Sequence, residues 1–421
     1  MSYTIEIKNK LKELFDNSSE NCTSVGYGFK EKNGILTKEK SIIFTFKKKK
    51  PLSELSENEI IPSYIEVDGI NINTDVVEGE NRYTGYEACP SNFYTWLDDD
   101  PLLNPNDVII PTNRNKIRPL KGGLKVRNRS NNFYGTMGFI AVDNDTNSLV
   151  GVTNNHVMSK IIFRADETLR EFYNEFNNNM AQPTYEDEIV GKTKRYFPVV
   201  STYVGNNYID AALFSIDEDY MDFNESYKFE GLSFTGAPTF ATTEEIDSLI
   251  DNDWDFYSSG AKTGPKGEGE TKLKFLSYTN VSLLADVANN QNDGIIKKSV
   301  RYLDCITFIA SASTTTSGNY CYYPIDGGDS GSALLANING TLKIIGLVFA
   351  SSEFDGYAVR AHACRIDKVS EILNISPFTG QTVNFTNKLA PLTHTVNSGS
   401  SLTGITINGL KYHQLGTFLP Q

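Results

Sequence analysis

The chain has 421 residues and a formal net charge of −13 at pH 7, because 52 Asp and Glu outnumber 39 Lys and Arg. A surface this acidic repels nucleic acid and anionic membranes, so we expect neither as a main partner. We interpret the acidic surface chiefly as an aid to solubility, with attraction of basic protein substrates as the alternative.

The cysteines indicate a reducing compartment. They are five in number, scattered, and form no Cys-x-x-Cys pair: Cys22, Cys89, Cys305, Cys321 and Cys364. Such usage is typical of buried thiols in a cytosol and offers no zinc spacing. The N-terminal residues contain no apolar segment of the signal-peptide kind, and no run of 18 apolar residues occurs. We therefore predict a cytoplasmic protein with no metal. With no phosphate-binding glycine loop either, we expect no cofactor.

The first 80 residues predict a small α+β domain. Residues 3–16 carry apolar side chains at helical spacing, which predicts a short amphipathic helix. Strand-like stretches follow at residues 24–30, 41–47 and 65–77. The last of them contains Asp68-Gly69, a turn signal that predicts a β-hairpin.

Residues 81–109 differ from what precedes them. They include the polar turn-forming stretches Asp98-Asp99-Asp100-Pro101 and Asn104-Pro105. We predict a linker here, or an irregular segment that lies over a neighbouring domain. Trp96 favours the second interpretation, because a large aromatic side chain tends to be covered.

Strand patterns are dense from about residue 110 onward. Residues 135–142 and 148–153 flank a turn-rich loop, which predicts a hairpin that leads directly to His156. A closing helix is predicted over 366–373, and we expect Pro377 to end it. Residues 377–421 are rich in Thr, Ser, Asn and Gly and predict either extra β-strands or a partner-binding tail.

A serine lies in a glycine-rich loop near the end of the strand-rich region, in the sequence Gly327-Gly328-Asp329-Ser330-Gly331. Glycines allow backbone conformations in which neighbouring N–H groups point to one place. The N–H groups of Gly328 and Ser330 are therefore candidates for an oxyanion hole, where losing one donor costs about 2.7–4 kcal/mol. A serine hydroxyl also needs a base to become a nucleophile.

Candidates for that base and for an orienting acid lie upstream. His156 follows a strand in Thr153-Asn154-Asn155-His156-Val157, and Asp210 precedes an apolar strand in Asp210-Ala211-Ala212-Leu213. His156 would take the serine proton, and Asp210 would hold the imidazole and stabilise its charged form. Asp217 and Asp219 are alternatives to Asp210, but they fall at the far end of the same strand.

The three motifs together, in the order His, Asp, Ser, resemble those of trypsin-like (chymotrypsin-fold) serine peptidases. Further matches lie at Arg118-Pro119-Leu120-Lys121-Gly122-Gly123, Gly135-Thr136-Met137-Gly138 and Tyr257-Ser258-Ser259-Gly260-Ala261-Lys262-Thr263-Gly264. With them, the chain resembles intracellular bacterial proteins related to the plant narrow-leaf proteins. The resemblance covers residues 24–78 and 117–374. It implies a mainly β fold with two six-stranded antiparallel β-barrels over residues 110–376, after the α+β domain.

The resemblance also implies roles for residues around the serine. Pro324, six residues before it, would form the floor of the primary specificity pocket, with Ala350 and Ser351 in its wall. A floor without a carboxylate favours small or apolar residues over Lys or Arg at the cleaved bond. Asp329 would hold the loop in place, and we expect no proteolytic activation, because a long N-terminal region precedes the barrels.

The predicted function is that of a hydrolase, an intracellular serine endopeptidase that cuts a limited set of protein or peptide substrates through an acyl-enzyme. Two alternatives stay open. The first is a catalytically idle barrel that serves as a scaffold for protein binding. The second is a regulatory protease that cuts one dedicated partner. A homo-oligomer is compatible with the sequence, which fixes no subunit number.

Overall fold

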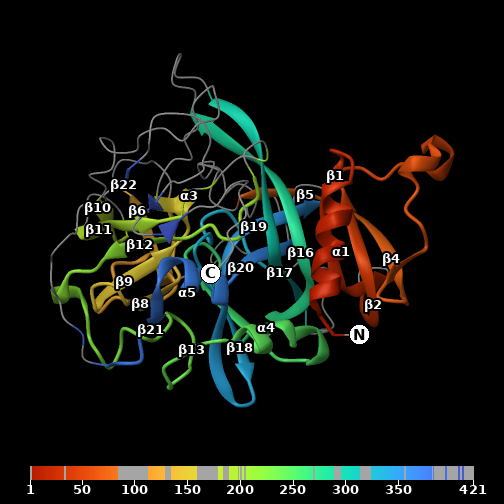
Figure 1. The fold of residues 1–421 in the computed structure, drawn as a ribbon. Coiled ribbons are helices and arrows are strands. Elements are labelled where there is room, and N and C mark those ends of the chain that lie inside the picture. Colours follow the sequence, from red (N-terminus) through yellow and green to blue (C-terminus); the bar gives the residue numbers. More distant parts are fainter. Residues whose placement is uncertain are drawn as a thin grey trace, which may run out of the picture.

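The computed structural model of the chain describes residues 2–32, 35–83, 112–128, 134–158, 179–183, 189–197, 199, 202, 205–268, 271–288, 295–312, 324–354, 357–381, 383, 394–395, 406–407 and 410–411. This part of the protein is mainly β, and its strands form two large sheets and one small one (Figure 1). Within these residues, no helix has both the length and the apolar character needed to cross a membrane.

The first barrel is built from the strands around His156. They are β6 (Leu124–Asn128), β7 (Tyr134–Met137), β8 (Phe139–Asp143), β9 (Ser148–Thr153), β10 (Asn179–Ala181), β11 (Ile189–Tyr196) and β12 (Ala212–Ser215). Their order is β8-β9-β12-β11-β10-β6-β7. Only Gly138 separates β7 from β8, so the two are halves of one bent strand and the path returns to its start. The sheet therefore has six strand positions around a barrel.

The second barrel carries the serine. Its strands are β14 (Phe256–Gly260), β16 (Thr271–Ala288), β17 (Ile295–Ala312), β18 (Ala333–Ile338), β19 (Thr341–Phe354) and β20 (Tyr357–Arg365), in the order β14-β18-β19-β20-β17-β16. Pairing of Phe256 with Leu273 joins β14 to β16 and closes the ring. The mainly β, chymotrypsin-like architecture predicted from the sequence is confirmed.

The N-terminal region adds to the second barrel. It contains α1 (Ile5–Asp16), β1 (Cys22–Lys32), β2 (Ile35–Phe46), β3 (Tyr64–Val67) and β4 (Ile70–Glu78). The predicted hairpin turn is present between β3 and β4, where Asp68 and Gly69 both have positive φ, 50° and 74°. Strand β1 pairs antiparallel with β16, from Ser24 opposite Val281 to Gly28 opposite Ser277. One continuous sheet thus joins the N-terminal strands to the barrel.

A short strand, β5 (Glu80–Tyr83), follows β4 and pairs with β19. It takes up the start of the segment predicted as a linker, and residues 84–109 of that segment lie outside the described residues. The division of the chain into domains at 1–80, 81–109, 110–376 and 377–421 stays a prediction.

The remaining elements are short. They are α3 (Asn155–Met158), α4 (Thr243–Asp247), α5 (Ile366–Leu373), β13 (Thr239–Phe240), β15 (Gly264–Lys266), β21 (Ile375–Pro377), β22 (His394–Thr395), β23 (Thr406–Ile407) and β24 (Leu410–Lys411). Short 3-10 turns lie at Leu52–Glu54, Glu57–Glu59, Thr112–Arg114, Glu218–Tyr220 and Leu249–Asp251.

The closing helix ends differently from the prediction. Helix α5 stops at Leu373 because the next residue, Asn374, takes the left-handed conformation, with φ 48° and ψ 58°. Asparagine tolerates this conformation better than most residues and is a frequent helix terminator. Pro377, expected to end the helix, instead lies in β21, which pairs with β8 of the first barrel.

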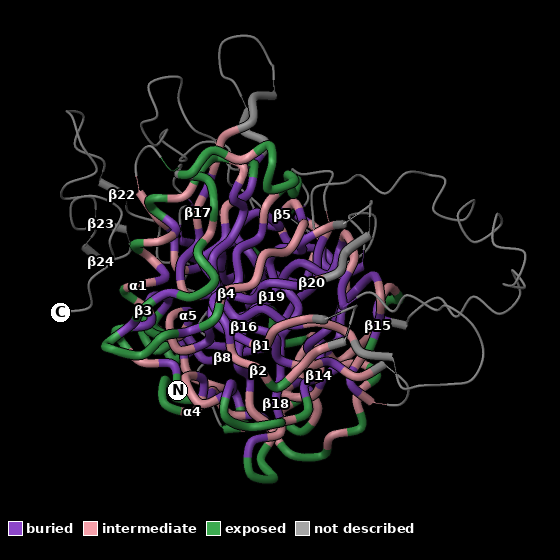
Figure 2. Tube along the Cα trace, turned by 90° about the vertical axis from the view of Figure 1, so that its right-hand side faces the viewer, coloured by how far each residue is buried: buried purple, intermediate pink, exposed green. Residues whose placement is uncertain are grey.

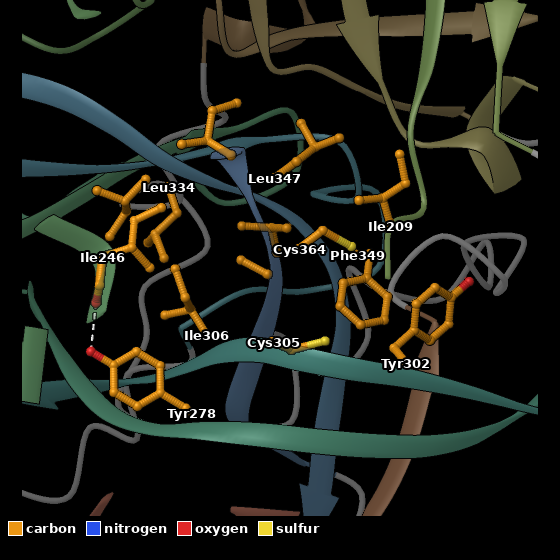
Figure 3. Close-up of a cluster of buried hydrophobic side chains, with 14 of the residues drawn as sticks. Ile209, Ile246, Tyr278, Tyr302, Cys305, Ile306, Leu334, Leu347, Phe349 and Cys364 are labelled. Carbon is orange, nitrogen blue, oxygen red and sulfur yellow. Dashed lines mark hydrogen bonds between the residues drawn. The ribbon is translucent and has the colours of Figure 1, made fainter. Parts of the chain in front are cut away.

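The core of the second barrel supports the residues nearest the candidate site. Buried residues fill the centre of the molecule (Figure 2). In the close-up, Ile209, Cys364 and Phe349 belong to one buried cluster (Figure 3). The ring of Phe349 packs on that of Tyr302 with centroids 4.5 Å apart. Because interiors are closely packed, this cluster fixes the backbone on either side of the site.

Candidate active site

His156 and Asp210 form a buried pair at the ends of two neighbouring strands. His156 lies in α3, directly after β9, and Asp210 lies just before β12. The ring nitrogen Nδ1 of His156 lies 2.5 Å from Oδ2 of Asp210, and the backbone N–H of His156 donates to Oδ1 at 3.2 Å. The His156 and Asp210 residues are 4% and 0% exposed. An ionised carboxylate only accepts hydrogen bonds, so the proton of the neutral ring is on Nδ1. The other nitrogen, Nε2, is then the basic one.

The backbone of Asp210 is held from both sides. Its carbonyl accepts a hydrogen bond from Nδ2 of Asn154 at 2.6 Å, and its N–H donates to the sulfur of Cys364 at 3.2 Å. Burial raises the pKa of the Cys364 thiol well above its ordinary value, so the sulfur stays uncharged beside the carboxylate. Asp210 is thus the aspartate that contacts His156, while Asp217 lies beyond the end of β12.

The loop that carries Ser330 contacts both barrels. Ser330 is fully buried, and its Oγ lies 3.5 Å from the carbonyl oxygen of Phe349 in β19. Its own carbonyl accepts from the N–H of Thr136 in β7 at 2.8 Å. The next residue, Gly331, has φ 92° and donates its N–H to the carbonyl of Val348 at 2.8 Å. The serine therefore has backbone contacts with both barrels.

A short chain of contacts links this loop to the histidine. Oγ1 of Thr153, at the end of β9, donates to the carbonyl of Thr136 at 2.7 Å, and the N–H of Thr136 donates to Ser330. A Cβ placed on Gly135 would lie 2.4 Å from the Val157 side chain and 2.8 Å from the Ser330 carbonyl. Gly135 in β7 thus lies close to both Val157 and the backbone of Ser330.

Thr136 is a positioning residue that the motifs did not reveal. Its Oγ1 donates to the carbonyl of Gly328 at 2.9 Å and accepts from the N–H of Ala261 at 2.9 Å. Together with its backbone, it joins the serine loop to the strands on either side. Glycines flanking a strand residue often mark a close approach of another backbone, and Gly135 and Gly138 were that signal.

The loop needs glycine at Gly328. Its φ is 106°, a region that residues with a Cβ rarely adopt. A Cβ there would also lie 2.5 Å from the ring of Tyr134. The shape of the loop at Gly328 and Ser330, the predicted oxyanion-hole residues, is therefore encoded by its glycines.

Asp329 holds the loop through four hydrogen bonds. Its Oδ1 accepts from the N–H groups of Lys262 and Thr263 at 2.8 and 3.1 Å, and its Oδ2 accepts from Oγ1 of Thr263 and the N–H of Asp326 at 2.8 and 2.9 Å. Burial raises the pKa of Asp329, and these hydrogen bonds oppose that effect. Three of these neutral donors come from the preceding hairpin and one from the loop itself, and the sequence did not reveal this role for Thr263.

The predicted pocket residues lie beside the serine loop. Pro324 is buried where the described part of this loop begins. Ala350 and Ser351 follow Phe349 in β19 and are 0% and 3% exposed. Strand β5 is paired with both of them, and their role as a pocket wall stays a prediction.

Comparison with known proteins gives structural likeness alone. The chain matches no known family model and no curated protein. Among solved structures, it is similar to a glutamic acid-specific serine protease described as using a histidine triad in substrate binding, with 13% identity, a TM-score of 0.34, and coverage of 62% of this chain and all of that one. It is also similar to Thermobifida fusca protease A, with 14% identity, a TM-score of 0.34, and coverage of 62% of this chain and 98% of that one. A third similar structure is Cellulomonas bogoriensis chymotrypsin, with 15% identity, a TM-score of 0.32 and the same coverage. The fold assignment rests on the strand order and closure of the two barrels.

Proposed function

We propose that this protein is a serine endopeptidase in which Ser330 is the nucleophile, His156 the general base and Asp210 the orienting acid. The observation that carries the proposal is the buried contact of 2.5 Å between Nδ1 of His156 and the Asp210 carboxylate. It leaves Nε2 as the ring's proton acceptor, on a segment connected to the serine loop through Thr136. A serine base needs this combination of tautomer and location.

The mechanism follows from these groups. As Oγ of Ser330 bonds to the peptide carbonyl carbon, its proton passes to Nε2 of His156, and Asp210 stabilises the imidazolium. The N–H groups of Gly328 and Ser330 donate to the oxyanion. His156 then protonates the leaving amine as the C–N bond breaks, which gives the acyl-enzyme. A water molecule then gives a proton to Nε2 as its oxygen bonds to the acyl carbon. The ester bond to Oγ of Ser330 breaks, the acid product leaves, and the imidazolium returns the proton to Oγ.

No proteolytic activation is needed in this proposal. The four donors on Asp329 already hold the loop without a charged N-terminal amine. The intact chain should therefore hydrolyse peptides as soon as they reach Ser330. Activity that arises only after N-terminal trimming would contradict this.

The substrates we propose are protein or peptide chains with small or apolar residues before the cleaved bond, because Pro324, Ala350 and Ser351 bring no charge to the predicted pocket. We propose a cytoplasmic location and kinship with the intracellular bacterial type. The free, buried thiols of Cys22 and Cys364 are compatible with a reducing compartment.

The test is to incubate the full-length protein with a proteome-derived peptide library and sequence the new termini by mass spectrometry. We expect new termini in the wild type and none with Ser330→Ala. Equal patterns for the two proteins would refute the proposal and favour the idle scaffold. Cleavage confined to one neighbour-encoded protein would instead favour the dedicated regulatory protease.

A further inference from the structure

One edge of β19 is shared by three segments. Along its other edge, β19 pairs with β20 over the whole stretch Gly346–Phe354. On the shared edge, β18 reaches only to Leu347. The Ser330 loop comes next, with Oγ near the carbonyl of Phe349. From Ala350 to Glu353 the edge is taken by β5. The part of the edge that leads away from the nucleophile is therefore filled by the chain's own strand.

An extended peptide that reaches Ser330 would use the same edge. Peptides commonly bind by adding a strand to an available sheet edge, where main-chain hydrogen bonds supply affinity. The acyl part of a substrate precedes the carbonyl attacked by Ser330, so it runs toward the serine. Because β19 runs away from the serine after Phe349, that part would lie antiparallel along Ala350–Glu353.

Strand β5 has this position and this polarity. It is antiparallel to β19, with Glu80 opposite Glu353 and Tyr83 opposite Ala350. Its backbone therefore advances toward Phe349 and Ser330, as the acyl part of a substrate would. A peptide and β5 cannot pair with this edge at the same time.

Strand β5 is firmly held. Asn81 is 2% exposed, and its Nδ2 donates to the carbonyls of Thr23 in β1 and Ser282 in β16 at 2.8 and 3.1 Å. Its Oδ1 lies 3.2 Å from Nε2 of His362 in β20. Next to it, Arg82 lies 3.4 Å from the carboxylate of Glu353. The buried contacts of Asn81 would be lost when β5 leaves, so displacement has a cost in free energy.

We propose that β5 is a built-in occupant of the acyl-side substrate site, and that extended peptides reach Ser330 only when β5 leaves the edge Ala350–Glu353. This inference rests on the proposed function, because the edge matters only if Ser330 is a nucleophile. It describes an endopeptidase whose catalytic groups are assembled while its peptide-binding edge is closed. The open fraction then sets the rate for peptides.

The test compares two reagents on the full-length protein. Diisopropyl fluorophosphate is small and needs no strand pairing, whereas a tripeptidyl diphenylphosphonate with alanine next to phosphorus needs the β19 edge. Asn81→Asp removes both side-chain donors and should loosen β5. We expect this variant to react about tenfold or more faster than the wild type with the peptidyl reagent, and within about twofold with the small one, since only peptide binding depends on the open fraction.

A matched control separates release of β5 from general destabilisation. Leu11 is buried in α1 and is not part of β5, so Leu11→Ala should lower stability and leave the ratio of the two labelling rates unchanged. An unchanged ratio in Asn81→Asp would overturn the role of β5, while labelling of Ser330 by the small reagent would keep the proposed function. If the small reagent labels Ser330 in none of the proteins, the proposed function fails and this inference with it.

A reversible lock gives a second readout. Glu80 and Glu353 are directly opposed, a spacing that suits a cross-strand disulfide in antiparallel strands. We would introduce Glu80→Cys and Glu353→Cys into the Asn81→Asp protein. Oxidation should slow the reaction with the peptidyl reagent about tenfold or more, because the disulfide holds β5 on β19. Dithiothreitol should restore the rate by reducing that disulfide. Equal rates in the oxidised and reduced forms would overturn the inference.

Discussion

Two buried histidines have opposite surroundings: His156 directly follows β9 of the first barrel, and His362 lies in the second barrel. His156 contacts the carboxylate of Asp210. His362, in β20, has neutral partners: its Nδ1 lies 2.9 Å from Oγ1 of Thr307, and its Nε2 lies 3.2 Å from Oδ1 of Asn81. Both residues are under 5% exposed. Burial alone therefore does not distinguish a catalytic histidine from a structural one.

The groups that contact each imidazole ring distinguish the two histidines. Burial lowers the pKa of His362 from 6.5 to about 3, and the nearby positive charge of Arg360 adds to the effect. This ring stays neutral near pH 7 and serves to hold Asn81, and so β5. Beside His156, the Asp210 carboxylate is placed to stabilise an imidazolium, which a general base must become. A buried histidine therefore suits proton transfer only when an acid partner lies beside it.

The largest expected effect is the difference in activity between variants of the two histidines. If the proposed triad is correct, His156→Asn should lower kcat by about 10⁶-fold, as loss of the base does in subtilisin. His362→Asn should change hydrolysis of a small activated ester by less than about tenfold, because it touches no reacting group. Circular dichroism and thermal unfolding would verify that both variants fold. Similar losses of activity in the two variants would erase the distinction.

The next effect tests the acid partner. Asp210→Asn should lower kcat by about 10⁴-fold with little loss of stability, because an amide no longer fixes the proton on Nδ1. The measurement is ester and peptide hydrolysis at pH 7 and at pH 9. If Asp210→Asn retains most of its activity, His156 does not depend on the contact that sets it apart from His362.

A smaller effect should come from the residue that joins the loops. Thr136→Val removes the hydrogen bonds to Gly328 and Ala261 and should lower kcat/KM by about 10²-fold, since a misplacement of catalytic groups by about 1 Å has an effect of this size. Thr136→Ser keeps the hydroxyl and is the matched control. Equal kinetics for Val and Ser would show that the hydroxyl does not position the serine loop.

The smallest effect concerns stability at the structural histidine. Its folded pKa is lowered, so the unfolded chain binds the proton more readily, and stability falls as the pH falls from 6.5 toward 3. The slope approaches about 1.4 kcal/mol per pH unit in this window. Urea unfolding at pH 6.5 and pH 5 should show a loss about 1.6 kcal/mol larger for the wild type than for His362→Asn. Parallel profiles would contradict this role for His362.

The sequence was sufficient for features encoded locally. The strand-rich character of the chain follows from its dense strand patterns, and the hairpin turn between β3 and β4 follows from Asp68-Gly69. The contact of His156 with Asp210 joins distant parts of the chain, but each residue stands in a short motif that identified it as a candidate.

Features encoded by distant contacts were not predicted. Strand β5 lies in a polar stretch and is a strand only because β19, some 270 residues later, offers an edge. The roles of Thr136 and Thr263 also arise from long-range hydrogen bonds. The helix stop was misassigned because Pro377 is the stronger sequence signal, although Asn374 already ends the helix.

The most direct test of the proposed triad is stoichiometric active-site labelling of the intact chain. The purified full-length protein is treated with a fluorophosphonate, and the modified peptide is sequenced by mass spectrometry. The proposal predicts one modified residue, Ser330, in the wild type and in His362→Asn, with none in His156→Asn. Absence of labelling in the wild type, or labelling of Ser330 that is equally fast without His156, would contradict it.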